Sequence, residues 1–117
     1  GELSAEGVDA RTRLREALVS GEVDRVSAAA RHADQWRGRE AELDRLLGHA
    51  LANVLMRADQ GLPLLEGNPA DGNNEWAGWL AAAALRAGDY ATMERIRRGL
   101  RLRDIDLVHP VVEQMTA

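Results

Sequence analysis

Two short segments far apart in the chain carry the same pattern, and this pattern constrains the fold more than any other feature. Residues 17–23 read Ala-Leu-Val-Ser-Gly-Glu-Val, and residues 84–90 read Ala-Leu-Arg-Ala-Gly-Asp-Tyr. Each copy ends an Ala/Leu-rich helical stretch at a glycine, the residue that most easily adopts the left-handed conformation that closes a helix. The copies start 67 residues apart (84 − 17), close to two periods of a helix-turn-helix repeat of about 34 residues. Such repeats stack helix pairs on a shared core.

Composition favours one helical domain over residues 1–117. The chain is 45% hydrophobic but has no Phe and one Tyr, so small and aliphatic side chains must fill its core, and these favour helices. It has no cysteine, which excludes disulfides, thiolate nucleophiles and cysteine zinc sites. We expect no membrane span and no signal peptide, because no run approaches about 20 apolar residues and the first residues lack a basic and an apolar region. The net charge of −4 disfavours nucleic-acid binding, and we expect a cytoplasmic protein.

Apolar spacing and helix-ending residues predict roughly six or seven helices arranged in about three antiparallel hairpins. The predicted segments are residues 9–20 with Asp9 as the cap, 22–36, 39–57, a short turn from Asp59 with Pro63 near its start, 75–87, 90–101 and a last helix from about Asp106. Residues 67–74 are rich in Gly, Asn and Pro, which predicts a surface loop. The middle hairpin has the weakest turn pattern, since Ala58-Asp59 stands where the other hairpins have glycine and an acid.

Gly88 sets a helical register that can be compared with the other hairpins. The register predicts core positions at Ala77, Leu80, Ala81 and Ala84. Counted back from Ala58 it selects Leu47, Ala50, Leu51 and Val54, which are all apolar. Counted back from Gly21 it selects Ala10, Arg13, Leu14 and Ala17, a weaker match that suits a terminal repeat. A further core stripe is predicted at Val23, Val26, Ala30 and Ala33.

The same register places a second group of side chains opposite the core. This group comprises Glu75, Trp79, Ala82 and Arg86 on one helix and Arg45, His49, Ala52 and Met56 on another. In helical repeats such a face often lines a concave groove, and Trp and Met suit contact with a partner helix. We therefore predict a partner-binding site at Trp79, Met56, His49, Ala82, Arg86 and Trp76. The alternative, in which Trp79 packs in the core, stays open at this point.

The chain shows no pattern typical of an enzyme or a metal site. Its histidines, His32, His49 and His109, form no metalloprotease motif, and no third ligand joins Glu42 and His49 on their shared face. Its serines and glycines form neither a nucleophile elbow nor a phosphate-binding loop. We expect no catalytic residue, no metal, no cofactor and no small-molecule substrate. The arginines between Arg95 and Arg103 are interpreted as a solvated helix end, with an acidic partner surface as the alternative.

Gly88-Asp89-Tyr90 resembles the turn of a tetratricopeptide repeat, and a narrower resemblance covers most of the chain. The architecture is similar to the larger needle-subunit chaperone of bacterial type III secretion. The resemblance rests on four features. The first is Ala17-Leu18 and Gly21 before an Ala-rich helix that ends at Trp36, and the second is Arg45-Leu46-Leu47, which opens a helix that closes at Met56-Arg57. The third is Gly67-Asn68-Pro69 before Glu75-Trp76, and the fourth is Met115. The chain departs from the family at the middle turn, Met56-Arg57-Ala58, and at Trp79 with the Ala81–Ala84 run.

This resemblance implies an all-α, right-handed solenoid of about three stacked hairpins. It also implies a cytoplasmic chaperone that holds a small secreted helical subunit in its concave groove together with a small co-chaperone. A generic helical-repeat adaptor, including a regulatory, ankyrin-like or immunity-type protein, is the alternative. An empty apolar groove would favour self-association of a chaperone, whereas an adaptor would be stable as a monomer.

Overall fold

The computed structural model describes residues 2–100, and every regular element in this range is a helix. The elements are α1 (Ala5–Ser20), α2 (Val23–Ala33), the 3₁₀ turn η1 (Asp34–Trp36), α3 (Ala41–His49), the π-helical turn η2 (Ala50–Val54), α4 (Ala58–Glu66), α5 (Asn74–Ala87) and α6 (Tyr90–Leu100). The predicted all-α class is confirmed for these residues. The helix predicted from Asp106 lies outside them. None of the described helices is long and apolar enough to cross a lipid bilayer.

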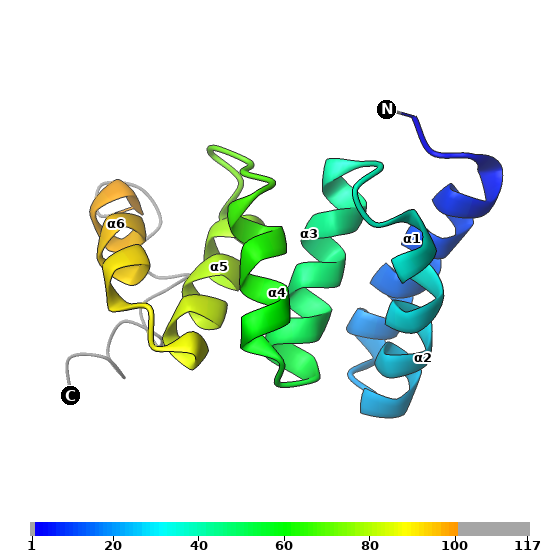
Figure 1. The fold of residues 1–117 in the computed structure, drawn as a ribbon, viewed down its shortest axis with the longest axis horizontal. Helices are drawn as coiled ribbons and strands as arrows, with labels where there is room; N and C mark the ends of the chain where they lie inside the picture. The colour runs from blue at the N-terminus through cyan, green and yellow to red at the C-terminus, as the bar shows by residue number, and fades with distance from the viewer. Residues whose placement is uncertain (1, 101–117) are drawn as a thin grey trace.

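Consecutive helices form pairs that follow one another along the longest axis of the molecule (Figure 1). Helix α1 packs on α2, α3 packs on α4, and α5 packs on α6. Helix α3 also contacts α1 on one side and α5 on the other. The first helices of the three pairs therefore lie in one row, and this row carries the candidate site.

Glycine ends the first helix of both outer pairs, as predicted. Gly21 has φ 72° and Gly88 has φ 75°, the left-handed conformation that glycine adopts without a steric penalty. The predicted loop is also present, and it ends at Asn73, whose side chain accepts a hydrogen bond from the Trp76 amide at 3.0 Å. Asn73 therefore caps α5 and sets its first residue.

The predicted start of the first helix is wrong by one turn. Ser4 caps α1 by accepting a hydrogen bond from the Gly7 amide at 3.1 Å, so the helix begins at Ala5 rather than at Asp9. Asp9 instead lies inside the helix and pairs with Arg13 at 2.8 Å, at i, i+4 spacing. Both residues are good cap formers, and the earlier one is used.

The middle turn also differs from its prediction. Helix α3 gives way to the π-helical turn η2, and the left-handed residue that follows is Met56, with φ 58°, not Ala58. The Arg57 amide closes the turn by donating to the Leu51 carbonyl at 2.7 Å. Ala58 is therefore the first residue of α4, a full helix of 9 residues in which Pro63 lies in the interior rather than near the start.

The core consists of small and aliphatic side chains from every pair. The predicted core positions of α5 are all buried, as are Leu47, Ala50 and Leu51 of the middle pair and Ala10, Leu14 and Ala17 of α1. Val54 is half-buried and Arg13 is exposed. Val23 was predicted in the core stripe of the second helix but is 55% exposed, and it is the first residue of α2.

The middle pair approaches closely because two glycines face each other. A Cβ atom placed on Gly61 would lie 2.3 Å from the Gly48 carbonyl oxygen and 2.6 Å from the Ala52 Cβ. A Cβ atom on Gly48 would lie 2.8 Å from the Gly61 carbonyl oxygen. Both contacts are shorter than van der Waals distance, so α3, η2 and α4 reach this separation only with glycine at both positions.

The substitution Gly61→Ala tests this close approach. The added methyl group meets backbone rather than a flexible side chain, so we expect the free energy of unfolding to fall by about 1–3 kcal/mol. The matched control is Gly78→Ala in the interior of α5, where a Cβ atom meets nothing within 4 Å. There alanine should raise the free energy of unfolding by about 0.4–1 kcal/mol. Urea unfolding measures both, and equal effects of the two substitutions would contradict the close packing.

Candidate functional site

The candidate site lies on one side of the row formed by α1, α3 and α5. We call it the α1/α3/α5 face and define it by its central and flanking side chains, Arg15, Glu42, Arg45, His49, Asn53, Met56, Glu75, Trp79 and Arg86. Between the three helices this face is hollowed by about 80 Å³, and the walls include Arg15, Arg45 and Trp79. The face therefore draws residues from all three helix pairs.

A histidine–tryptophan stack forms the centre of the face. The rings of His49 and Trp79 lie parallel, with 4.3 Å between their centroids and 3° between their planes. Asn53 holds them together, because its Nδ2 atom donates to His49 Nδ1 at 3.0 Å and to the Trp79 carbonyl at 3.1 Å. With Nδ1 as the acceptor, the imidazole carries its proton on Nε2. The Asn53 Oδ1 atom is buried and has no hydrogen-bond partner among the described residues.

Trp79 combines the two roles that the sequence left open. Its side chain is half-buried and packs against both hydrophobic clusters of the core. Its remaining surface belongs to the α1/α3/α5 face and lines the central hollow. Trp79 therefore supports the core and is still accessible from the face.

Burial and a nearby arginine keep His49 neutral near physiological pH. Burial is the larger cause and the positive charge of Arg86 the smaller, and together they lower the pKa of His49 from 6.5 to about 4. A neutral imidazole stacks on indole without a charge to desolvate. The centre of the face is therefore uncharged, although it lies between arginine side chains.

Met56 and Arg86 extend the face beyond the stack. The Met56 side chain is 64% exposed, and its sulfur lies 3.3 Å from Nη1 of Arg86. His49 contacts Trp79 and Met56 contacts Arg86, and both pairs are 30 residues apart (79 − 49 and 86 − 56). This constant offset is the one that the sequence register used to assign these residues to equivalent positions of their helix pairs. That equivalent side chains contact each other is a finding of the structure.

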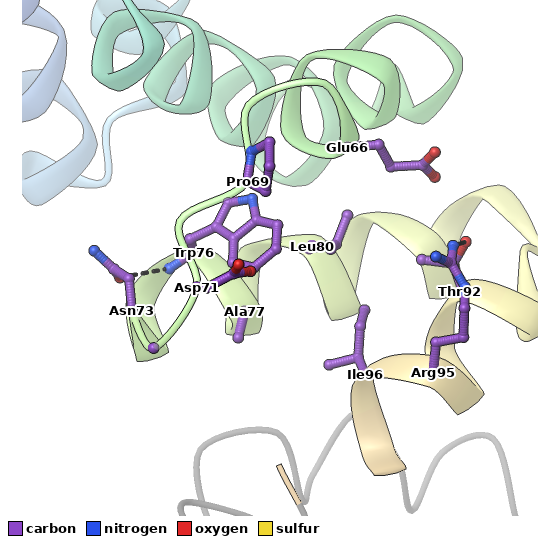
Figure 2. A pocket seen from close by; sticks show the side chains of 11 residues that line it. Glu66, Pro69, Asp71, Asn73, Trp76, Ala77, Leu80, Thr92, Arg95 and Ile96 are labelled. Atoms are coloured by element: carbon purple, nitrogen blue, oxygen red, sulfur yellow. Dashed lines mark hydrogen bonds between the residues drawn. The ribbon is translucent and has the colours of Figure 1, made fainter. Parts of the chain in front are cut away.

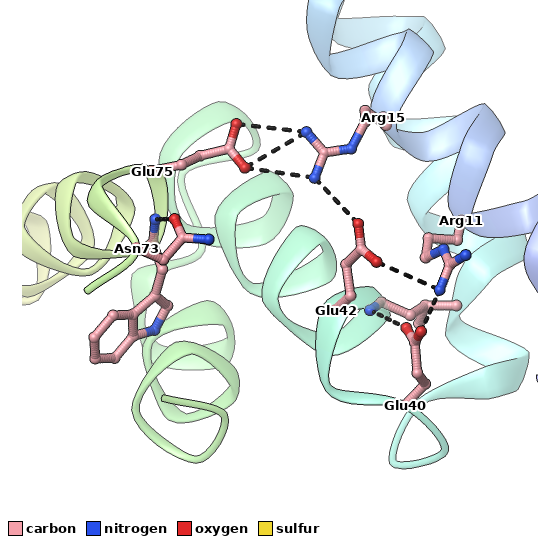
Figure 3. Close-up of polar contacts among 8 residues, drawn as sticks. Arg11, Arg15, Glu40, Glu42, Asn73 and Glu75 are labelled. Carbon is pink, nitrogen blue, oxygen red and sulfur yellow. Dashed lines mark hydrogen bonds and ion pairs between the residues drawn. The ribbon is translucent and has the colours of Figure 1, made fainter. Parts of the chain in front are cut away.

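Ion pairs connect the three helices at the other end of the face. Arg15 of α1 lies 3.4 Å from carboxylate oxygens of both Glu42 and Glu75, and Figure 3 shows its guanidinium group between them. Arg11 pairs with Glu40 and lies 3.4 Å from Glu42. These side chains are partly exposed, so each pair contributes little to stability. Together they join two arginines to three carboxylates at this end of the face.

The structure places the remaining predicted site residues differently. Ala82 is half-buried on α5. Trp76 also lines the central hollow, but its indole nitrogen donates to the Leu65 carbonyl of α4 at 2.9 Å, so one edge of the ring is held by the scaffold. Ala52 was expected on the face and is fully buried. The π-helical turn adds one residue to this stretch, which turns Ala52 toward Gly61 and brings Asn53 to the face.

A larger hollow of about 640 Å³ lies between α4, α5, α6 and the loop before α5. Its walls combine apolar and charged side chains, among them Glu66, Trp76, Leu80, Arg95 and Ile96, and Figure 2 shows Leu80 and Ile96 on neighbouring helices. Arg95 donates to the Thr92 hydroxyl at 2.8 Å. The hollow contains no unpaired buried polar atom and no aromatic stack among the described side chains. We therefore treat the α1/α3/α5 face as the stronger candidate.

Neither the face nor the rest of residues 2–100 gathers the ligands that a metal ion requires. No group of three or more His, Cys, Asp or Glu side chains is arranged to hold one within this range. On the face itself the only hydrogen bond described for His49 comes from Asn53.

Comparisons with known proteins do not place the chain in a family. No family model, no curated protein and no solved structure matches it.

The low pKa of His49 predicts a pH dependence of stability. The unfolded chain takes up the His49 proton near the ordinary pKa of about 6.5, whereas the folded chain takes it up near 4. Stability is therefore full above about pH 6.5 and falls as the pH is lowered toward 4. Between about pH 7.5 and pH 5 the loss due to this group should be about 2 kcal/mol.

The variant His49→Phe isolates this contribution, because phenylalanine retains a ring against Trp79 but does not titrate. Urea unfolding of both proteins at the two pH values gives the difference, from which the other ionisable groups cancel. An equal loss of stability in wild type and His49→Phe would show that His49 is not desolvated in the folded chain.

Proposed function

We propose that this protein is a non-enzymatic binding module whose α1/α3/α5 face receives an amphipathic helix from a protein partner. The observation that carries the proposal is the neutral His49–Trp79 stack beside the exposed side chain of Met56. Half-buried aromatic side chains and flexible thioethers are the residue types that anchor partner helices. Charged side chains surround this apolar centre, as in the polar rim of many protein interfaces.

The arrangement of the helices supports this proposal. We propose that the three pairs form a right-handed, tetratricopeptide-like solenoid, in which the first helix of each pair lines the concave side. The row of α1, α3 and α5 and the hollow between them fit this arrangement. A helix lying in such a groove would touch all three pairs at once.

The chemistry of the face argues against catalysis. A general base needs a pKa near the working pH, and that of His49 is lowered to about 4. The carboxylates of Glu42 and Glu75 are engaged with Arg15. A non-enzymatic role therefore fits these side chains better than acid–base chemistry.

For the identity of the partner we propose a small secreted helical subunit, held in the cytoplasm together with a small co-chaperone. This proposal rests on the resemblance of the sequence to needle-subunit chaperones of type III secretion. The second candidate is a generic helical-repeat adaptor. Sedimentation of the purified chain separates them, because a chaperone with an empty groove should self-associate and an adaptor should remain monomeric.

The substitution Trp79→Ala tests the binding site. Loss of a central aromatic anchor costs about 2 kcal/mol or more of binding free energy, so the affinity should fall by about thirtyfold or more. Because Trp79 also packs on the core, the free energy of unfolding should fall as well, by about 1–3 kcal/mol for a half-buried side chain. The affinity is therefore measured by titration calorimetry under conditions in which the variant remains folded.

The control is Trp36→Ala. Trp36 is also half-buried and also contacts a histidine, His32, at 5.4 Å between ring centroids, but it lies at the end of η1, away from the α1/α3/α5 face. The partner is the protein that co-purifies with the tagged chain from its native host. It should be retained by wild type and Trp36→Ala and lost from Trp79→Ala. Retention by Trp79→Ala, or capture of nucleic acid in place of a protein, would refute the proposed site.

A further inference from the structure

Met56 has the left-handed backbone conformation at the turn where the two outer helix pairs have glycine. The first helices of the outer pairs end at Gly21 and Gly88, with φ 72° and 75°, whereas the middle pair has Met56 with φ 58°. A residue with a Cβ atom is disfavoured in this left-handed region, and within residues 2–100 Met56 is the only non-glycine residue there. The chain thus gives up backbone stability at Met56 that glycine would retain.

Packing within the chain does not compensate for this cost. The Met56 side chain is 64% exposed and makes its described polar contact with Arg86, through the sulfur. A residue in an unfavourable conformation with an exposed apolar side chain points to a role outside the folding of the chain. For a thioether that role is contact with an apolar side chain of another molecule.

The charge next to Met56 is not balanced. Arg86 contacts the Met56 sulfur at 3.3 Å and forms no ion pair with any carboxylate among residues 2–100. Its charge acts on the centre of the face, where it disfavours protonation of His49. An uncharged sulfur accepts a hydrogen bond but leaves the positive charge of Arg86 unpaired.

At the opposite end of the face the charged side chains form ion pairs. There Arg11 and Arg15 are paired with Glu40, Glu42 and Glu75. The α1/α3/α5 face therefore has a charge asymmetry along its length, with ion pairs that include three carboxylates on the side of α1 and Arg86, without a carboxylate, beside an exposed thioether on the side of α5. Arg45 of the same face also has no ion pair among residues 2–100, but it donates to the Asn68 carbonyl at 3.2 Å.

From this asymmetry we infer that Met56 and Arg86 form a specificity-determining subsite, which takes a helix carrying a carboxylate next to an apolar side chain. The apolar side chain packs on Met56 and the carboxylate pairs with Arg86. This inference rests on the proposed function and adds the chemistry of the partner to it. Nucleic acid fits the subsite poorly, because a single arginine on a face whose other end carries three carboxylates gives no track for a phosphate backbone.

A display library of amphipathic helical peptides tests the inference. The library randomises the residues that flank an apolar stripe with Asp, Glu, Lys, Arg, Ser and Gln, and peptides are selected for binding to the full chain. We expect selected peptides to be enriched in Asp or Glu beside the stripe and to lose binding to Trp79→Ala. Their affinity should fall with added salt, because the pair with Arg86 is exposed.

Exchange of the charges then tests whether Arg86 is the arginine that pairs with the carboxylate of the peptide. Arg86→Glu should lower the affinity for the selected acidic peptide by about fivefold or more. A peptide with Lys in place of the carboxylate should restore the affinity for this variant. The matched control is Arg25→Glu on α2, an exposed arginine that lies away from the α1/α3/α5 face. It should leave the affinities for both peptides unchanged. An equal effect of the two substitutions would show that only the net charge of the protein matters, and this would overturn the inference.

Two substitutions of Met56 separate its side chain from its backbone. Met56→Gly should lower the affinity for the acidic peptide by about fivefold or more, because the side chain is lost. It should also raise the melting temperature by about 3–8 °C, because glycine adopts the left-handed conformation without strain. Met56→Ala should lower the affinity for the peptide by a similar factor. It should not raise the melting temperature, because alanine keeps the Cβ atom that is disfavoured in this conformation. Unchanged affinity in both variants would overturn the role of Met56.

The outcomes distinguish this inference from the proposed function. Selected peptides that depend on Trp79 but show no preference for acids, or a preference for Lys and Arg, would overturn the subsite and leave the binding face in place. A library that yields no binder, or binders indifferent to Trp79→Ala, would overturn both.

Discussion

The close approach of α4 to α3 and η2 is the constraint on which the rest of the structure depends. Gly61 faces Gly48 and Ala52 at distances that exclude any Cβ atom, so the middle pair is held at backbone contact. Helices α1 and α5 then pack on either side of α3. The position of the row that carries the α1/α3/α5 face therefore depends on two positions without side chains.

The π-helical turn connects this packing to the face. By adding one residue after His49, it turns Ala52 toward Gly61 and presents Asn53 to the stacked rings. Wide turns of this type occur mostly inside α-helices and frequently at functional sites. In this chain the turn provides a core contact through Ala52 and a face contact through Asn53, and one residue, Leu55, separates it from the left-handed Met56.

The sequence predicted the features that depend on local patterns and on a regular helix. The core of α5 was predicted correctly because Gly88 ends the helix and fixes the count backward to Ala84 and Leu80. The offset of 30 residues that brings His49 to Trp79 followed from the same count. These predictions hold as long as each residue advances the helix by the same angle.

Prediction from the sequence failed where the helix is no longer regular or where the contacting residues are distant along the chain. The π-helical turn cannot be read from an apolar repeat, so Asn53 was missed and Ala52 was misplaced. The pairing of Arg15 with Glu75 joins residues 60 positions apart, and no local pattern indicates it. At the start of α1, Ser4 and Asp9 are both good cap residues, and only the contacts of the folded chain decide between them.

The order of the helix pairs also has a consequence for how the chain folds. Each pair contacts mainly its neighbours along the row, so most contacts join residues that are close in sequence, a topology that folds rapidly. The middle pair is the only one of the three described pairs with a neighbour on both sides, and it contains the glycine contact. We expect it to act as the folding nucleus, from which order spreads in both directions along the row. The outer pairs would then open first. Because His49 lies on α3 and Trp79 on α5, opening of the α5/α6 pair would separate the two stacked rings and take apart the centre of the α1/α3/α5 face.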